Sequence, residues 1–123
     1  MMTQEGKELL LKDLCARLPY GVKGIVEDGI KITTPTEWPV EKSIEFSMRY
    51  MVIKNEWRPY LFPLSSMTKE QKKEFDTTLK YLPAEEINFW TLNTYDWCNK
   101  NHFDYRGLIE KGLAIDATGL GIY

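Results

Sequence analysis

The chain reads SIEFSMRYMVI over residues 43–53, and this is its clearest strand pattern. Apolar side chains occupy every second position there, with Glu45, Ser47 and Arg49 between them. Alternation with a period of two is typical of a strand with one buried face and one exposed face. The last three residues are apolar on both faces, so we expect that end of the strand to be covered. The segment therefore predicts a β-sheet packed on a core.

Residues 22–34 predict a β-hairpin that belongs to the same sheet. Valine and isoleucine residues flank Asp28-Gly29, a dipeptide that supplies the positive φ angles of a type I′ turn. In the register that a two-residue loop imposes, Ile25 faces Ile32.

Residues 57–64 are a further extended segment. They contain Pro59 and Pro63, which lack the N–H group that a central strand donates to its neighbours, so we expect an edge strand or an extended arm. With the hairpin 22–34 and the strand 43–53, this edge segment predicts a small antiparallel sheet of about three to four strands.

The remaining segments predict helices at residues 4–18, 69–82 and 84–102. Thr3 is a suitable N-cap for the first helix, and Pro19 ends it. The third is expected to begin at Pro83, with two glutamates in its first turn as the helix dipole prefers. This third helix is apolar over more than half of its circumference, which indicates a helix packed on two sides or against a partner.

The first predicted helix has an apolar stripe at helical spacing, formed by Leu10, Leu11, Leu14, Cys15 and Leu18. Asp13 and Arg17 lie off this stripe at i,i+4 spacing, so we expect an ion pair on the solvent side.

Together these segments predict one α+β domain over residues 1–123. The expected order is an N-terminal helix, the small antiparallel sheet, two helices, and a short C-terminal segment that starts near residue 103. A chain of this length buries enough surface to fold without disulfides or metals.

Composition excludes several classes of protein. Sixteen basic and eighteen acidic residues give a net charge of −2, and no stretch is basic enough to attract a polyanion, which disfavours nucleic acid as a partner. Four Trp, seven Tyr and five Phe residues exclude a disordered chain. No secretory signal and no run of about 20 apolar residues is present, so we expect a cytoplasmic protein without membrane contact.

The segment HFDYRG at residues 102–107 has the highest density of reactive side chains. His102 is the only histidine, and with Asp104 it could form an acid–base pair. We favour a structural interpretation, in which His102, Asp104, Tyr105 and Arg106 lie together at the end of a helix. There they would organise the C-terminal segment, and Gly107 would allow the chain to turn.

A second candidate site is formed by Ser65, Ser66 and Thr68 ahead of the helix at 69–82. Thr68 and Gln71 have the spacing of a capping box. We favour a structural interpretation, in which the hydroxyl groups accept hydrogen bonds from the first N–H groups of the helix. The alternative is an anion site at the helix N-terminus.

The cysteines do not indicate a metal or redox site. Cys15 and Cys98 are too few and too distant in sequence for a disulfide framework, and with one histidine they do not complete a metal site. Cys98 could pair with His102 as a nucleophile, but a small buried apolar side chain is the favoured interpretation. We expect no metal and no cofactor.

Two blocks of the sequence resemble a family of small uncharacterised proteins from gut anaerobic bacteria and their phages and mobile elements. These blocks are PYLFPLSSMT at residues 59–68 and NHFDYRGLI at residues 101–109, and LPYGVK at residues 18–23 is also similar. Phe62 stands where that family has a basic residue. The resemblance implies a genetic context and no activity, cofactor or catalytic residue.

The favoured functional hypothesis is a non-enzymatic protein-interaction or regulatory protein of a phage or mobile element. Aromatic residues are common anchors at protein interfaces, and a partner protein or a homo-oligomer would account for their abundance. Two alternatives stay open. One is a nucleic-acid-associated module that uses the small sheet, and the other is a small enzyme with a site around His102 and Asp104.

Overall fold

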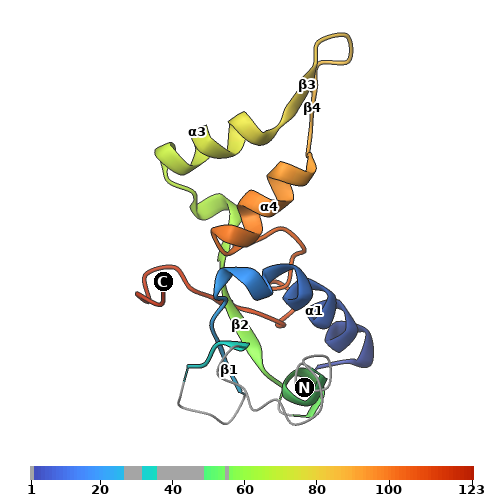
Figure 1. The fold of residues 1–123 in the computed structure, drawn as a ribbon, viewed down its shortest axis with the longest axis vertical. Helices are drawn as coiled ribbons and strands as arrows, with labels where there is room; N and C mark the ends of the chain where they lie inside the picture. Colours follow the sequence, from blue (N-terminus) through green and yellow to red (C-terminus); the bar gives the residue numbers. More distant parts are fainter. Residues whose placement is uncertain (1, 27–31, 36–48, 55) are drawn as a thin grey trace.

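The computed structural model describes residues 2–26, 32–35, 49–54 and 56–123 (Figure 1). It confirms the α+β class, with an N-terminal helix, a small sheet and further helices. The helices are α1 (Gln4–Arg17), α3 (Lys69–Thr78) and α4 (Leu92–Lys100), with short helical turns η1 (Leu18–Tyr20), η3 (Tyr50–Lys54) and η4 (Leu64–Ser66). The strands are β1 (Gly24–Ile25), β2 (Arg58–Pro63), β3 (Lys80–Leu82), β4 (Ile87–Phe89), β5 (Phe103–Asp104) and β6 (Ile115–Asp116).

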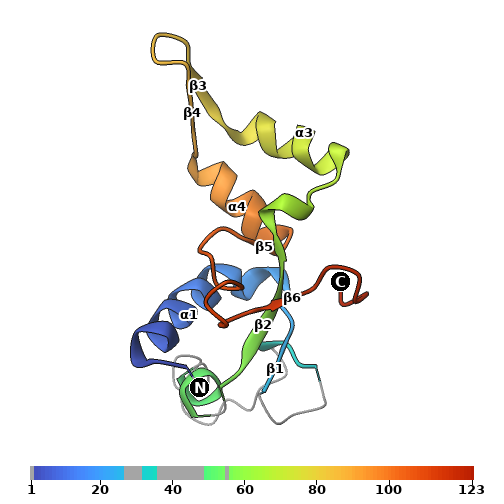
Figure 2. The same cartoon turned by 180° about the vertical axis from the view of Figure 1, so that it is seen from behind.

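The sheet is built around β2 and is mixed, so the prediction of an antiparallel sheet is wrong. Strand β1 pairs with β2 in antiparallel orientation, whereas β5 and β6 are parallel to it (Figure 2). After β2 the chain runs through α3, the β3–β4 hairpin and α4 before it returns as β5. A crossover of this length is what parallel pairing requires.

The prediction that residues 57–64 form an edge strand is also wrong, because β2 is the central strand. The N–H groups of Tyr60 and Phe62 donate to the carbonyls of Lys23 and His102, both at 2.8 Å. N–H groups of alternate residues point to the same edge of a strand. Both prolines therefore face the other edge, where the short strand β6 pairs and the Leu61 carbonyl accepts from Ala117.

The predicted hairpin at 22–34 is described only in part. Gly24 and Thr33 form an antiparallel bridge, and each N–H donates to the other carbonyl at 2.8 Å. This pair belongs to the register that aligns Ile25 with Ile32. The predicted turn at Asp28-Gly29 lies outside the described residues.

Most of the predicted strand at 43–53 also lies outside the described residues, and its end has a different structure. Residues Tyr50–Lys54 form a π-helical turn. Val52 is fully buried in the core, and Met51 and Ile53 pack against the same cluster. A helical turn allows three consecutive apolar side chains to reach one core, whereas a strand would direct Val52 to the face opposite the other two.

The predicted helices at 69–82 and 84–102 are shorter than expected, because a β-hairpin separates them. Helix α3 ends at Thr78, and α4 begins only at Leu92. Thr91 caps α4 and forms a capping box with Thr94. Pro83 does not start a helix; it lies in the turn between β3 and β4.

Two hydrophobic clusters form the core. The first joins α1, η3, β2 and the C-terminal segment through Leu10, Leu11, Leu14, Val22, Val52, Trp57, Leu61, Leu108, Leu113 and Ala114. The second consists of Phe75, Cys98 and Phe103, with half-buried aromatic residues around them. Within the described residues, no helix is long and apolar enough to cross a membrane.

Candidate functional site

The β3–β4 hairpin projects beyond α3 and α4 at one end of the molecule (Figures 1 and 2). We call residues 80–89 the arm. The pairs Lys80–Phe89, Tyr81–Asn88 and Leu82–Ile87 place Leu82, Ile87 and Phe89 on one face and Tyr81 on the other. All strand residues of the arm are exposed except Leu82, which is half-buried. The arm therefore presents large apolar side chains to solvent.

Threonines at the base of the arm hold its two ends together. The Thr91 hydroxyl donates to the Thr78 carbonyl at 2.8 Å, and the hydroxyl of the buried Thr94 donates to the same carbonyl at 3.0 Å. Next to them, Trp90 packs edge-on against Phe75 with ring centroids 5.3 Å apart. These contacts fix the point where the arm leaves the core.

An open pocket of about 460 Å³ lies at this base, lined by Asn88, Phe89, Trp90, Tyr95 and Tyr105. We call it the aromatic pocket. The ring centroids of Trp90 and Tyr95 are 5.1 Å apart, and those of Tyr95 and Tyr105 are 5.2 Å apart. The lining carries no charged side chain.

Two arginines lie against Tyr105. The guanidinium carbons of Arg17 and Arg106 are 5.3 and 5.1 Å from the centre of its ring, which is cation–π distance. Both arginines also bind Asp13: Arg17 Nε donates to one carboxylate oxygen at 2.7 Å, and Arg106 Nε donates to the other at 3.1 Å. Arg17 further donates to the Phe103 carbonyl at 2.7 Å.

The prediction of an exposed Asp13–Arg17 pair is wrong, because both side chains are fully buried. The buried residues of α1 are Leu10, Leu11, Asp13, Leu14 and Arg17. They include three leucines of the predicted stripe, but Cys15 is exposed, and Asp13 and Arg17 are buried instead. The pair joins α1 to the segment at 103–106 and so supports the wall of the aromatic pocket.

Asp104 is buried and organises the loop that follows β5. Its carboxylate accepts from the N–H groups of Arg106, Leu108 and Ile109 at 3.2, 3.0 and 2.9 Å. Gly107, inside this loop, has a φ angle of +71°, which glycine adopts at little cost. The Asp104 oxygens are thus engaged by backbone donors rather than by His102.

His102 faces away from the aromatic pocket toward the C-terminal segment. Its ring stacks on Tyr123, with centroids 3.6 Å apart and an angle of 11° between the planes. The Tyr123 hydroxyl donates to the Tyr60 carbonyl at 2.8 Å and accepts from the Lys23 N–H at 2.9 Å. His102 therefore helps to hold the C-terminal segment against β1 and β2.

Burial lowers the pKa of His102 from 6.5 to about 4, and the positive charges of Arg17 and Lys23 contribute in the same direction. Between these values the unfolded chain binds the proton and the folded chain does not. The stability that the neutral ring provides is present above pH 6.5 and lost as the pH falls through about 4.

We expect the unfolding free energy of the His102→Asn variant to fall less than that of the wild-type chain when the pH is lowered from 6.5 to about 4. Urea unfolding at a series of pH values measures the difference. Asparagine is chosen as the replacement because it also tolerates the φ angle of +64° at this position. Parallel stability curves for the two proteins would contradict this assignment.

Ser65, Ser66 and Thr68 make local contacts at the start of α3. Thr68 and Gln71 form the predicted capping box in both directions, at 3.1 and 2.9 Å. The Ser66 hydroxyl donates to the Pro63 carbonyl at 2.7 Å, and Ser65 is exposed. The hydroxyls of Ser66 and Thr68 thus satisfy backbone groups of the chain itself.

Cys98 is a buried core residue, and burial raises the pKa of its thiol to about 11. A thiol with such a pKa stays protonated at neutral pH and is a poor nucleophile. In the described part of the chain, no group of three or more His, Cys, Asp or Glu side chains is placed to hold a metal ion.

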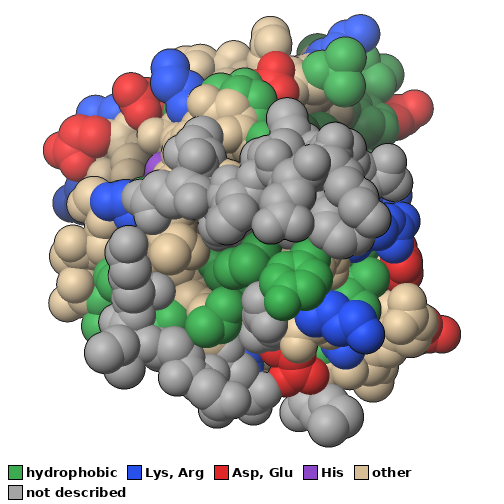
Figure 3. All heavy atoms as spheres, turned by 60° about the horizontal axis from the view of Figure 1, so that its bottom comes forward, with side chains coloured by type: hydrophobic (Ala, Val, Ile, Leu, Met, Phe, Trp, Pro, Cys, Tyr) green, Lys and Arg blue, Asp and Glu red, His purple; other side chains and the backbone are tan. Residues whose placement is uncertain are grey.

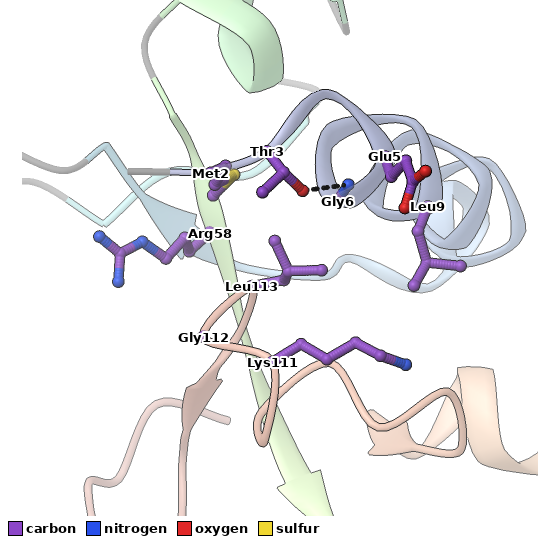
Figure 4. A pocket seen from close by; sticks show the side chains of 9 residues that line it. All are labelled: Met2, Thr3, Glu5, Gly6, Leu9, Arg58, Lys111, Gly112 and Leu113. Atoms are coloured by element: carbon purple, nitrogen blue, oxygen red, sulfur yellow. Dashed lines mark hydrogen bonds between the residues drawn. The ribbon is translucent and has the colours of Figure 1, made fainter.

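A second pocket, of about 540 Å³, lies at the N-terminal end of α1 (Figure 4). Leu113 lies near its centre, and the side chains of Arg58 and Lys111 extend to opposite sides. The Thr3 hydroxyl already accepts from the Gly6 N–H at 3.0 Å. The polar groups of this pocket therefore point in different directions, whereas the polar groups of a site for one small ligand converge on it.

The face opposite the arm shows charges of both signs (Figure 3). Basic and acidic side chains are interspersed on its described part, with hydrophobic side chains near the centre. Among the described side chains of this face, neither sign of charge forms a continuous patch of the kind that attracts a polyanion.

The structure thus separates the candidate residues near position 102 into different environments. Tyr105 lines the aromatic pocket and Arg106 packs against its ring, Asp104 holds a loop, and His102 packs on Tyr123. Sequence reasoning missed Asp13 and Arg17 as parts of this region, because their i,i+4 spacing indicates that they pair but not that they are buried. Comparison with known proteins finds no matching family model, no similar curated protein and no similar solved structure.

Proposed function

We propose that the protein is a non-enzymatic protein-binding domain, and that the arm and the aromatic pocket form its contact surface. The proposal rests on one observation. Tyr81, Ile87 and Phe89 are 54%, 45% and 42% exposed on a hairpin without a core of its own, beside Leu92, which is 84% exposed.

Such an arrangement is unfavourable for a chain that contacts only water. A two-stranded hairpin is at best marginally stable in water, and each buried Å² of apolar surface contributes about 25 cal/mol. Covering the arm with a partner would stabilise the complex through both effects. Exposed apolar surface next to aromatic side chains is typical of protein interfaces. The sequence resemblance adds the further proposal of a regulatory protein of a phage or mobile element.

The geometry favours neither alternative function. An acid–base pair would require Asp104 to orient His102, but the Asp104 oxygens accept from three backbone N–H groups. A duplex-binding module would require a cluster of phosphate neutralisers, and the aromatic pocket has none in its lining.

The proposal is tested by photo-crosslinking in cells that naturally carry the gene. A benzoylphenylalanine residue at position 89 is expected to capture a specific protein, because Phe89 lies on the apolar face of the arm. The matched control carries the same residue at position 120, since Leu120 is an apolar side chain outside the arm with 54% exposure. Capture from position 120 but not from position 89 would contradict the proposal.

A double variant provides the second readout. Ile87→Ser with Phe89→Ser is expected to abolish partner binding and to leave the melting temperature unchanged, because both side chains are exposed. If the wild-type chain dimerises and the double variant does not, the partner is a second copy of the chain. If binding survives in a folded double variant, the arm is not the contact surface.

A further inference from the structure

We infer that the aromatic pocket binds a proline-containing segment in the polyproline II conformation, which makes a peptide of this class the partner element. This inference rests on the proposed protein-binding function and specifies the ligand of the same site. It follows from the charge, ring geometry and hydrogen-bonding groups of Trp90, Tyr95 and Tyr105 with their neighbours.

The charges near the pocket disfavour a cationic ligand. Three aromatic rings around a cavity would otherwise suit a methylated ammonium group. Here the Tyr105 ring already contacts the guanidinium groups of Arg17 and Arg106. Asp13 supplies one negative charge against these two positive charges. A ligand cation at the Tyr105 ring would therefore be repelled by a net positive charge close to it.

The angles between the rings disfavour a flat aromatic ligand, such as a nucleobase, that is held between two of the rings. A base is held best by stacking on the face of an aromatic ring, or between two parallel rings. The planes of Trp90 and Tyr95 meet at 51°, those of Trp90 and Tyr105 at 59°, and those of Tyr95 and Tyr105 at 70°. These three rings therefore line the pocket with no two of their planes parallel.

A proline ring suits the aromatic pocket because it is neutral, compact and puckered. The polyproline II backbone makes no internal hydrogen bonds, so its carbonyls need external donors. The pocket lining supplies such donors in the Asn88 amide, the Trp90 indole N–H and the Tyr95 hydroxyl. Within the described residues, these three side chains make no hydrogen bond of their own. Grooves lined by aromatic residues bind proline-rich segments in this way, and a preformed segment loses little entropy on binding.

The test is a titration of the full chain with an acetylated oligoproline peptide, followed by calorimetry and by ¹H–¹⁵N NMR. We expect saturable binding, with shifts of the Trp90 indole and Asn88 amide signals. Tyr95→Ala should weaken binding about tenfold or more, as expected for an aromatic anchor. Leu120→Ala is the control and should bind like the wild-type chain, since Leu120 is an exposed apolar residue outside the arm and outside the pocket lining.

Three results would overturn the inference: no saturable oligoproline binding, equal binding by a folded Tyr95→Ala variant, or tighter binding of trimethyllysine or adenosine monophosphate at the same signals. A glycine–serine peptide of equal length controls for non-specific contact. If position 89 captures a protein but oligoproline does not bind, the ligand class is wrong and the protein-binding function stands. If position 89 captures nothing, the proposed function itself fails.

Discussion

Asp13→Ala is expected to destabilise the fold by about 3–5 kcal/mol, the cost of removing one partner from a buried ion pair. Arg17 is fully buried, and its Nε–H group donates to Asp13 at 2.7 Å. Without the carboxylate, a guanidinium charge would remain in the core, with the Phe103 carbonyl as its one hydrogen-bond acceptor among the described residues. Urea unfolding followed by circular dichroism measures the change in free energy.

Two variants separate the buried pair from the second partner of Asp13. Arg106 is partly exposed, with 22% of its side chain accessible, so Arg106→Ala should cost only about 1 kcal/mol. Combining Asp13→Ala with Arg17→Met should recover much of the lost stability, because no buried charge is left. If Asp13→Ala costs no more than Arg106→Ala, the buried pair does not stabilise the fold as described.

Gly24→Ala is expected to destabilise the fold by about 3 kcal/mol or more, at the upper end of overpacking effects. A Cβ atom at position 24 would overlap the Trp57 ring and the carbonyl oxygen of Arg58. Trp57 is fully buried, and Arg58 belongs to β2, where it pairs with Ile25. Neither can move without disturbing the central strand.

Gly21→Ala is the matched control for this prediction. Gly21 has a φ angle of +68°, and a Cβ atom added there would meet open space, so the substitution adds only backbone strain. That strain costs about 1 kcal/mol. Comparison of the two unfolding free energies isolates the clash at Gly24. Equal destabilisation by the two variants would show that the strand can shift to accommodate a methyl group.

Local sequence signals predicted those parts of the structure that depend on neighbouring residues. Thr3 caps α1, and Thr68 and Gln71 form the capping box of α3. The Gly24–Thr33 bridge has the predicted hairpin register. In each case the partners are close in the chain, so residue type and spacing are sufficient to identify the contact.

The arm shows where local signals misled. Residues 84–102 have apolar side chains over more than half of a helical wheel, which predicted one long helix packed on two sides or against a partner. In the structure Ile87 and Phe89 belong to a strand, and the helix starts only after Thr91. The short run INFW at residues 87–90 fits a strand or a helix equally well. Here the capping by Thr91 and its bond to Thr78 select the hairpin.

What the sequence by itself determined is the α+β class, the first helix, the caps and one hairpin register, because short-range geometry controls these features. Only the tertiary structure placed β2 at the centre of a mixed sheet, because the edge that its prolines face depends on which strands pair with it. Only the tertiary structure buried Asp13 and Arg17, since an i,i+4 pair has the same spacing in water and in a core. The aromatic pocket likewise joins Trp90 and Tyr95 to Tyr105 from beyond α4. Packing between distant segments decides such contacts, and no local pattern encodes it.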